Sequence, residues 1–567
     1  MLYEEPPRAL PSRSRSTGRG MHSCRVPAGQ IQERRQRLAP CGGYRRPRAR
    51  CGRPAWHATF SAVATALLLT ALNSPLLAQD GAARSAHRQP SGEDLPVIEY
   101  VLDNGMRFLI LPREGAPTVS FVARYDVGSV NEALGHTGIA HLLEHMLFKG
   151  TTTVGTRDLA SERELFEAMD AVDATLRAER ARRPLRDSAR IAALAERLKA
   201  LEDSARAFVV SNEFDRILTR NGARNLNATT DVEATTYYVQ LPSNRAELWF
   251  ALEADRMRNP VFREFYTERD VVAEERRMRI ETSPGGLLYT SLMAAAFRVH
   301  PYGVPVIGHM SDILNLNREQ VETYYRDYYG PNNAIIAVVG DVDPDSVVAW
   351  ADAYFGPIPR GREPPPVVAV EPPQRGERRV EVRYDAEPQL LVGWHVPSAL
   401  DRDAPALAML TAVLGGGRTS RLYRRLVLEE KLAQSVSASM APGARDPRLF
   451  IIGAVTTQGH TTAELERTIY EELERLKHEP PPEEELTRIR NQLEAGAVYR
   501  LRSNFGLAHQ LVESVALWGD WRATFRSIED YREVEPEDVQ RVVERYFTRG
   551  NRTVATLVRE GTGEETS

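Results

Sequence analysis

Cysteine is scarce in this chain. Three cysteines occur among 567 residues, Cys24, Cys41 and Cys51, and all of them precede Ala78, after which we predict that a leader is removed. The mature chain would then contain no cysteine. This absence excludes a disulfide framework and thiol chemistry, and it argues against a lipid anchor on an N-terminal cysteine.

Long hydrophobic runs are also few. Residues 60–72 form an uncharged apolar run that is too short to span a bilayer comfortably. A basic stretch precedes the run, and Asn73 to Ala78 follow it as a cleavage region, so residues of about 58–78 are predicted to be a secretory signal peptide. We therefore expect an exported, periplasmic protein, with an uncleaved membrane anchor as the main alternative.

A basic surplus is absent from the part that should fold. The formal net charge is −4, yet residues 1–57 alone hold thirteen arginines and three glutamates. The remainder is therefore distinctly acidic. An acidic folded part argues against nucleic-acid binding as the main function.

The composition is that of a soluble globular protein, with 42% hydrophobic and 26% charged residues. A chain of this length predicts several domains. Composition shifts and a Pro-rich stretch predict the following divisions: a basic head with the signal peptide (1–78), a disordered lead-in (79–95), a metal-binding unit (96–356) with a helical insertion at about 162–212, a linker (357–376), a second unit (377–560) and a tail (561–567).

The run His141-Leu142-Leu143-Glu144-His145 is the strongest local signal. Residues four apart share one face of a helix, so His141 and His145 can both direct an imidazole at one point, as two ligands of a zinc ion would. Glu144 can then reach a metal-bound water as a general base without being a ligand. A helix that carries two histidines by chance is the alternative. The His-x-x-Glu-His order is the inverzincin pattern.

A third ligand must come from elsewhere in the chain, because catalytic zinc takes three protein ligands. The acidic stretch of residues 266–277 is the best source. Glu268 and Glu275 are seven residues apart, two helical turns, and so share a face. One of these carboxylates would bind the metal and the other would support the ligands from behind.

With these two stretches, the chain resembles the insulinase/pitrilysin family of zinc metallopeptidases, which includes relatives of the mitochondrial processing peptidase. The resemblance implies one zinc ion per chain, bound by His141, His145 and Glu275, with Glu144 as the catalytic base and Glu268 in contact with the ligands. Glu274 is the alternative third ligand. The long separation between His145 and the acidic stretch is explained by the insertion, which is either a lid or docking arm or a solvated elaboration.

The resemblance also implies a substrate site at Asn227 and Ala228, on an edge strand beside the metal where a peptide would add as a further strand. An ordinary turn that enters a core strand is the other interpretation of this segment. After residue 377 the pattern of strands and helices repeats. The repeat of the metal helix, residues 407–416, contains no His or Glu, so the second unit is expected to bind no zinc.

One feature of the family is missing from this chain. Relatives carry a substrate-binding Arg/Tyr pair in the second unit, and Val427 and Gln434 stand at those positions here. Neither side chain can stabilise an oxyanion as that pair would. We therefore expect a homodimer, or a heterodimer with a related subunit that supplies the pair.

These inferences predict an α+β fold of two homologous units, each a largely antiparallel sheet with helices on one face, that together form half of a clamshell. The predicted function is zinc-dependent endopeptidase action on peptides or unfolded protein segments. The alternatives are a catalytically silent assembly subunit and a peptide-binding module with the same fold.

Overall fold

The computed structural model describes residues 95–559. The basic head, the predicted signal peptide, nearly all of the predicted lead-in and the tail lie outside the described residues. Within the described part of the chain, none of the helices is both long enough and apolar enough to cross a membrane.

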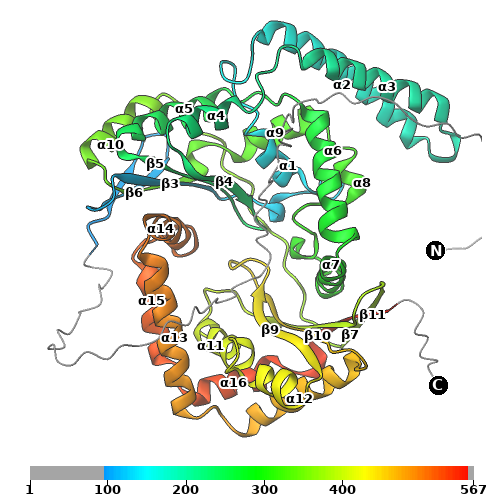
Figure 1. The fold of residues 1–567 in the computed structure, drawn as a ribbon, viewed down its shortest axis with the longest axis vertical. Coiled ribbons are helices and arrows are strands. Elements are labelled where there is room, and N and C mark those ends of the chain that lie inside the picture. Colours follow the sequence, from blue (N-terminus) through cyan, green and yellow to red (C-terminus); the bar gives the residue numbers. More distant parts are fainter. Residues whose placement is uncertain (1–94, 560–567) are drawn as a thin grey trace, which may run out of the picture. The chain divides into compact units, whose positions relative to one another are not determined.

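The first sheet has six strands in the order β1-β2-β6-β3-β5-β4 (Figure 1). Their bounds are β1 Ile98–Val101, β2 Arg107–Pro112, β3 Thr118–Tyr125, β4 Arg224–Thr230, β5 Thr235–Pro242 and β6 Ala334–Gly340. Strands β2 and β6 run parallel, and every other pair is antiparallel. The hairpin predicted at Asn104-Gly105 joins β1 to β2, and Gly105 adopts a φ of 93° in that turn.

The second sheet has five strands in the order β7-β11-β8-β10-β9. Their bounds are β7 Arg378–Arg383, β8 Gln389–Val396, β9 Ala433–Ala441, β10 Arg448–Thr456 and β11 Arg552–Val558. Strands β7 and β11 run parallel and the other pairs are antiparallel. This arrangement repeats β2-β6-β3-β5-β4 strand for strand, and it confirms the predicted α+β class and the two largely antiparallel sheets.

Sixteen α-helices lie within the described residues. In the first half they are α1 Ile139–Met146, α2 Leu159–Ala181, α3 Ser188–Ala205, α4 Glu213–Arg220, α5 Ala246–Arg258, α6 Phe265–Arg276, α7 Pro284–Ala296, α8 Met310–Ile313, α9 Arg318–Tyr328 and α10 Pro344–Trp350. In the second half they are α11 Ala404–Gly415, α12 Thr462–His478, α13 Glu483–Leu501, α14 Asn504–Trp518, α15 Ala523–Glu533 and α16 Pro536–Tyr546. Residues 359–377, which join the halves, contain neither helix nor strand.

Each sheet is buried on both faces. One face of the first sheet packs on helices of its own half, through residues such as Phe121 and Val338. The opposite face, with Leu109 and Val122, packs on Leu511 and its neighbours in α14, a helix of the second half. Successive strand residues point to opposite faces, so both sets of alternating positions must be apolar.

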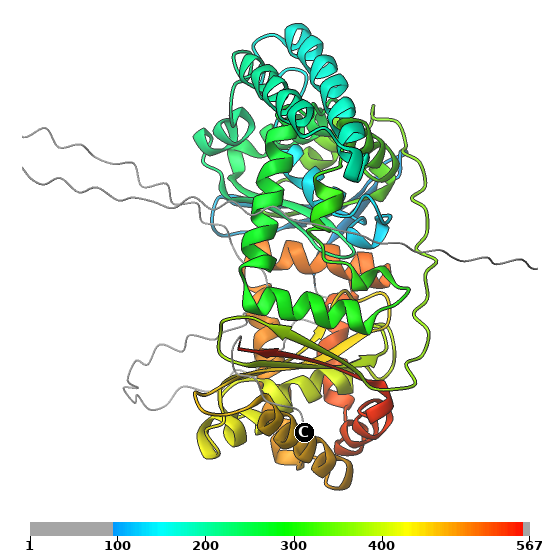
Figure 2. The same cartoon turned by 90° about the vertical axis from the view of Figure 1, so that its right-hand side faces the viewer.

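The second sheet shows the reciprocal arrangement. One face packs on α11, α12 and α16 of its own half. The other face packs on α7 of the first half, where Leu288 and Leu292 belong to the same buried cluster as Ile451 and Leu557 of the sheet. Figure 2 shows α7 lying along these strands. The two halves therefore exchange one helix each, an addition to the predicted single layer of helices.

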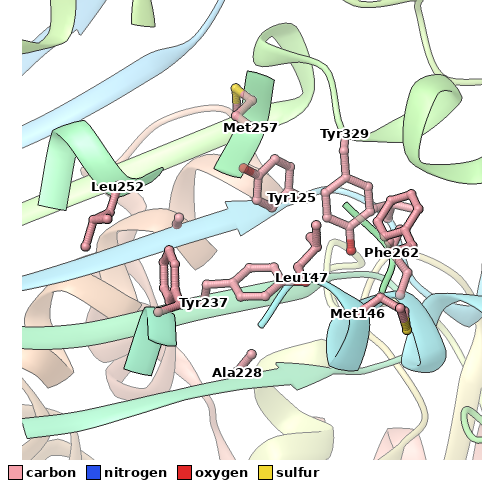
Figure 3. Close-up of a cluster of buried hydrophobic side chains, with 14 of the residues drawn as sticks. Tyr125, Met146, Leu147, Ala228, Tyr237, Leu252, Met257, Phe262 and Tyr329 are labelled. Carbon is pink, nitrogen blue, oxygen red and sulfur yellow. The ribbon is translucent and has the colours of Figure 1, made fainter. Parts of the chain in front are cut away.

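Helix α1, which carries the His-x-x-Glu-His motif, is held at its C-terminal end by aromatic residues of the core between the first sheet and the helices of its own half. Met146 and Leu147 lie among Tyr125, Tyr237 and Tyr329 (Figure 3), and all five residues are buried. Tyr125 and Tyr329 have ring centroids 4.6 Å apart. Close packing of this kind fixes the rotation of α1 and with it the direction of the side chains on its other face.

Candidate metal centre and its surroundings

Helix α1 begins at a position that only glycine can occupy. Gly138 precedes the helix with a φ of +88°, and a Cβ atom there would lie 2.5 Å from the carbonyl oxygen of Ile307. Because glycine offers no capping side chain, the distant Glu132 supplies one, and its carboxylate accepts the N–H groups of Gly138 and Ala140 at 2.8 Å each. Burial raises the pKa of Glu132 to about 8.

Two imidazoles and one carboxylate converge on a single point. His141 and His145, one turn apart on α1, have ring centroids 4.9 Å apart. The Oε2 atom of Glu275, on α6, lies 3.8 Å from Nε2 of His141 and 3.6 Å from Nε2 of His145. One potential ligand atom from each of the three residues lies within 4.8 Å of the other two.

Glu274 points elsewhere. Its side chain is 72% exposed and pairs with Arg277 at 2.6 Å. Glu275 is instead 9% exposed, and its second oxygen, Oε1, is held by Arg279 at 2.6 Å. Arg279 belongs to the π-helical turn η5 (Arg277–Glu281) that follows α6, and this turn brings the guanidinium back over the carboxylate.

Glu268 lies behind the ring of His145. Its Oε2 atom is 3.3 Å from Nδ1 of His145, and its Oε1 atom is 2.5 Å from Nζ of Lys149. A proton on Nδ1 that is donated to Glu268 leaves the lone pair of Nε2 free to bind a metal. Burial opposes the charge of Glu268, but the contacts with His145 and Lys149 outweigh it and lower the pKa of the carboxyl.

These residues fit a zinc ion. The Oε2 atom of Glu275 is buried and receives no hydrogen bond within the described chain, although two ring nitrogens face it. Burial, with the nearby charges of His145 and Arg279, lowers the pKa of His141 well below its ordinary value, which keeps that imidazole neutral as a metal ligand must be. Two imidazole nitrogens and a carboxylate form one of the common donor sets of catalytic zinc.

Glu144 lies beside this group on α1. Its Oε2 atom accepts a hydrogen bond of 2.5 Å from the hydroxyl of Thr230, at the end of strand β4. Its other oxygen receives no hydrogen bond from the described residues. Burial raises the pKa of Glu144, against the opposing effect of the Thr230 hydrogen bond. A carboxylate with a raised pKa and one free oxygen is suited to accept a proton.

Strand β4 is an edge of the first sheet. It pairs with β5 on one side, where Asn227 is opposite Tyr238 and Ala228 is opposite Tyr237, and no described strand pairs with its other side. The side chain of Asn227 is exposed, whereas Ala228 is 5% exposed and faces the core. The strand ends at Thr230, so its free edge leads directly to Glu144.

Val427 and Gln434 lie in the second half. Val427, in the π-helical turn η9 (Tyr423–Glu429), packs against the core between the second sheet and the helices of its own half. Gln434, in β9, donates its side-chain amide to the carbonyl oxygen of Thr456 at 2.9 Å. Neither residue offers a charged or phenolic group.

Sequence reasoning did not assign a role to Thr230, Lys149 or Arg279. Lys149 and Arg279 each follow a motif residue by four positions, after His145 and Glu275 respectively, and that spacing was a usable signal. Nothing in the sequence pairs Thr230 with Glu144, because the two are 86 residues apart.

Comparison with known proteins gives consistent matches. Residues 109–180 and 195–309 match the model of the insulinase family, peptidase family M16. Residues 315–493 match the model described as the peptidase M16 inactive domain. The interval between the first two ranges falls within the α2–α3 hairpin.

Individual relatives align over most of the chain. The zinc protease PqqE of Helicobacter pylori is 30% identical over 496 residues, which cover 84% of this chain and 96% of that protein. A crystal structure of a protease from Helicobacter pylori superposes with a TM-score of 0.69 at 26% identity, covering 82% of this chain and all of the other. The periplasmic protease PqqL from Escherichia coli shares the fold, with a TM-score of 0.59 at 18% identity over 82% of this chain and 47% of PqqL.

Proposed function

Because the chain belongs to the M16 insulinase family of zinc proteases, we propose that it is an endopeptidase that hydrolyses peptides or unfolded protein segments. The observation that carries the proposal is the convergence of His141, His145 and Glu275 next to Glu144. In this proposal the first three residues hold one zinc ion, and Glu144 is the catalytic base. Bound zinc would supply a Lewis acid that polarises a peptide carbonyl and acidifies water.

Each side chain around the metal site has its own role in the proposed reaction. Glu144 accepts a proton at its free oxygen and passes it to the leaving amine, while Thr230 keeps its other oxygen fixed. Glu268 orients the ring of His145, and Lys149 balances the charge of Glu268. Arg279 holds one oxygen of Glu275, which keeps the other directed at the histidines.

We propose that a substrate peptide adds as a strand along the free edge of β4, at Asn227 and Ala228. Backbone hydrogen bonds would provide most of this recognition, so varied side chains would be accepted. The exposed side chain of Asn227 would contact the peptide, and the small buried Ala228 would allow the close approach of its backbone.

The residues found at positions 427 and 434, Val427 and Gln434, favour an active enzyme that is a dimer. Because they cannot stabilise an oxyanion, we propose that a second subunit of the same family supplies an Arg/Tyr pair. A homodimer would place two copies of the same Val/Gln pair at the sites, so a heterodimer is the form that completes the chemistry. The isolated chain would then bind zinc but cleave slowly.

The remaining proposals concern organisation and location. We propose a zinc-binding unit at 96–356, a linker at 357–376 and a second unit at 377–560, in agreement with the two sheets. We also propose export to the periplasm through the signal peptide at about 58–78, which lies outside the described residues. PqqL, a periplasmic protease of Escherichia coli, shares the fold.

The test uses the chain with any co-purifying partner, a quenched fluorescent peptide library and a zinc assay. Glu144→Gln should lose at least about a thousandfold in cleavage rate while zinc remains bound, because only the base is removed. Glu275→Gln should lose both cleavage and zinc. Glu274→Gln, the matched control one residue away, should retain both.

The outcomes separate the alternatives. Cleavage that survives Glu144→Gln would refute the role of the base. Stoichiometric peptide binding without cleavage, in the presence of zinc and partner, would identify a peptide-binding module. If the chain neither cleaves nor binds peptides, the catalytically silent assembly subunit would be the remaining alternative.

A further inference from the structure

The α2–α3 hairpin ends in a strongly basic tip. The turn η3 (Arg183–Leu185) joins the two helices (Figure 1). Residues 180–190, defined here as the hairpin tip, are all exposed. Residues 177–190 contain six arginines and two acids, Glu179 and Asp187. This is a concentrated positive charge in a folded part that is acidic as a whole.

Both acids of residues 177–190 are already engaged. Glu179 is 4% exposed and accepts hydrogen bonds from Arg182 and from the backbone N–H of Asp187. Asp187 caps helix α3 by accepting the N–H groups of Ala189 and Arg190. By contrast, Arg180, Arg183 and Arg186 have no ion-pair partner among the described residues.

Helix stability explains Arg180 but not Arg183 or Arg186. Arg180 lies in the last turn of α2, where a cation is favourable, but Arg186 directly precedes the N-terminus of α3, where a cation is unfavourable. Arg183 adopts a φ of 51°, a left-handed conformation that is costly for an arginine. Arg183 and Arg186 therefore stand at positions that carry a local cost.

An apolar side chain stands at the centre of this charge. Leu185 is 75% exposed at the apex, next to Pro184 and between Arg183 and Arg186. Farther down the hairpin the exposed charges are mixed, since Glu164 and Glu167 lie beside Arg163 near the start of α2. An apolar apex within a ring of cations matches the polarity of a surface with negative headgroups above a hydrocarbon interior.

We propose that the hairpin tip binds an anionic lipid surface, with Leu185 inserted among the headgroups and Arg180, Arg183 and Arg186 paired with phosphates. A convex tip with one apolar side chain offers too little area for a stable protein interface, which buries about 1,000 Å² or more. A deformable lipid surface can surround the same tip from all sides. Such binding would hold the protease beside a membrane.

The experiment measures co-sedimentation of the full chain with phosphatidylglycerol vesicles and with phosphatidylcholine vesicles, at low and high salt. The wild type should bind the anionic vesicles more tightly, and salt should reduce the difference. In the triple variant Arg180→Gln, Arg183→Gln, Arg186→Gln, the affinity for the anionic vesicles should fall on the order of a hundredfold. In Leu185→Ser, the affinity for the anionic vesicles should fall roughly tenfold.

The matched control removes three positive charges elsewhere. The triple variant Arg220→Gln, Arg298→Gln, Arg418→Gln has the same net charge, and all three positions are exposed. It should bind the vesicles nearly as the wild type does. Both triple variants should cleave soluble peptides at the wild-type rate, which separates this proposal from the proposed catalytic function.

Three results would overturn the proposal. The first is equal binding of the wild type to both kinds of vesicle. The second is an equal loss of binding in the two triple variants. The third is binding to immobilised polyglutamate but not to anionic vesicles, which would assign the tip to an acidic protein.

Discussion

The hydrogen bond between Thr230 and Glu144 gives a sharp prediction about catalysis. Thr230→Val keeps the shape of the side chain and suits a strand, but it removes the hydroxyl that lies 2.5 Å from Oε2 of Glu144. A hydrogen bond to a charged group contributes about 1.5–3 kcal/mol, so kcat/KM should fall between about tenfold and about a hundredfold. The loss should appear mainly in kcat, because Thr230 acts through the base and not on the substrate.

Two further variants isolate the hydroxyl. Thr230→Ser retains the donor and should recover most of the rate. Thr229→Val changes the neighbouring residue, whose hydroxyl makes no hydrogen bond within the described chain, and should cleave as the wild type does. Steady-state kinetics on one peptide, with zinc content measured in parallel, provides the assay. Thr230→Val at the wild-type kcat/KM with full zinc content would refute the positioning role.

Three other predictions concern the metal support, the helix cap and the core. Lys149→Met leaves the buried Glu268 without its cation and should weaken zinc binding about tenfold in a chelator competition; unchanged affinity would contradict this role. Burial raises the pKa of Glu132 to about 8 in the folded chain, so the contribution of its carboxyl group to stability is full below about pH 4.5 and is lost as the pH rises to about 8. Glu132→Gln should remove this part of the pH dependence of the melting temperature. Parallel curves of melting temperature against pH for the variant and the wild type would contradict this prediction. Leu511→Ala should lower the free energy of unfolding by about 2–5 kcal/mol in urea titrations, because this residue is fully buried against the first sheet; a loss below about 1 kcal/mol would show that α14 contributes little there.

Local patterns were enough to predict much of the fold. Alternating apolar residues around Asn104-Gly105 predicted the hairpin, and the repeat of strand patterns after residue 377 predicted a second sheet. The exchange of α7 and α14 between the halves was not predictable. Both helices are apolar on the face that packs, but helical periodicity does not say which sheet a helix will cover, because that depends on contacts between distant segments.

The same distinction holds at the candidate site. The spacing of His141 and His145 predicted a shared face because four residues make one helical turn. Glu275 and Glu274 could not be separated by spacing alone, and the rotation of α6 brings the former to the histidines. The contacts of Thr230 with Glu144 and of Glu132 with the start of α1 link separate elements, so only the folded arrangement reveals them.

In the proposed function, His141, His145 and Glu275 hold a zinc ion. The most direct measurement is anomalous diffraction at the zinc edge from crystals of the purified chain. We predict one peak per chain, about 2.0–2.2 Å from Nε2 of each histidine and from a carboxylate oxygen of Glu275. Zinc bound elsewhere, or crystals of the zinc-treated chain without a peak at these three atoms, would contradict it.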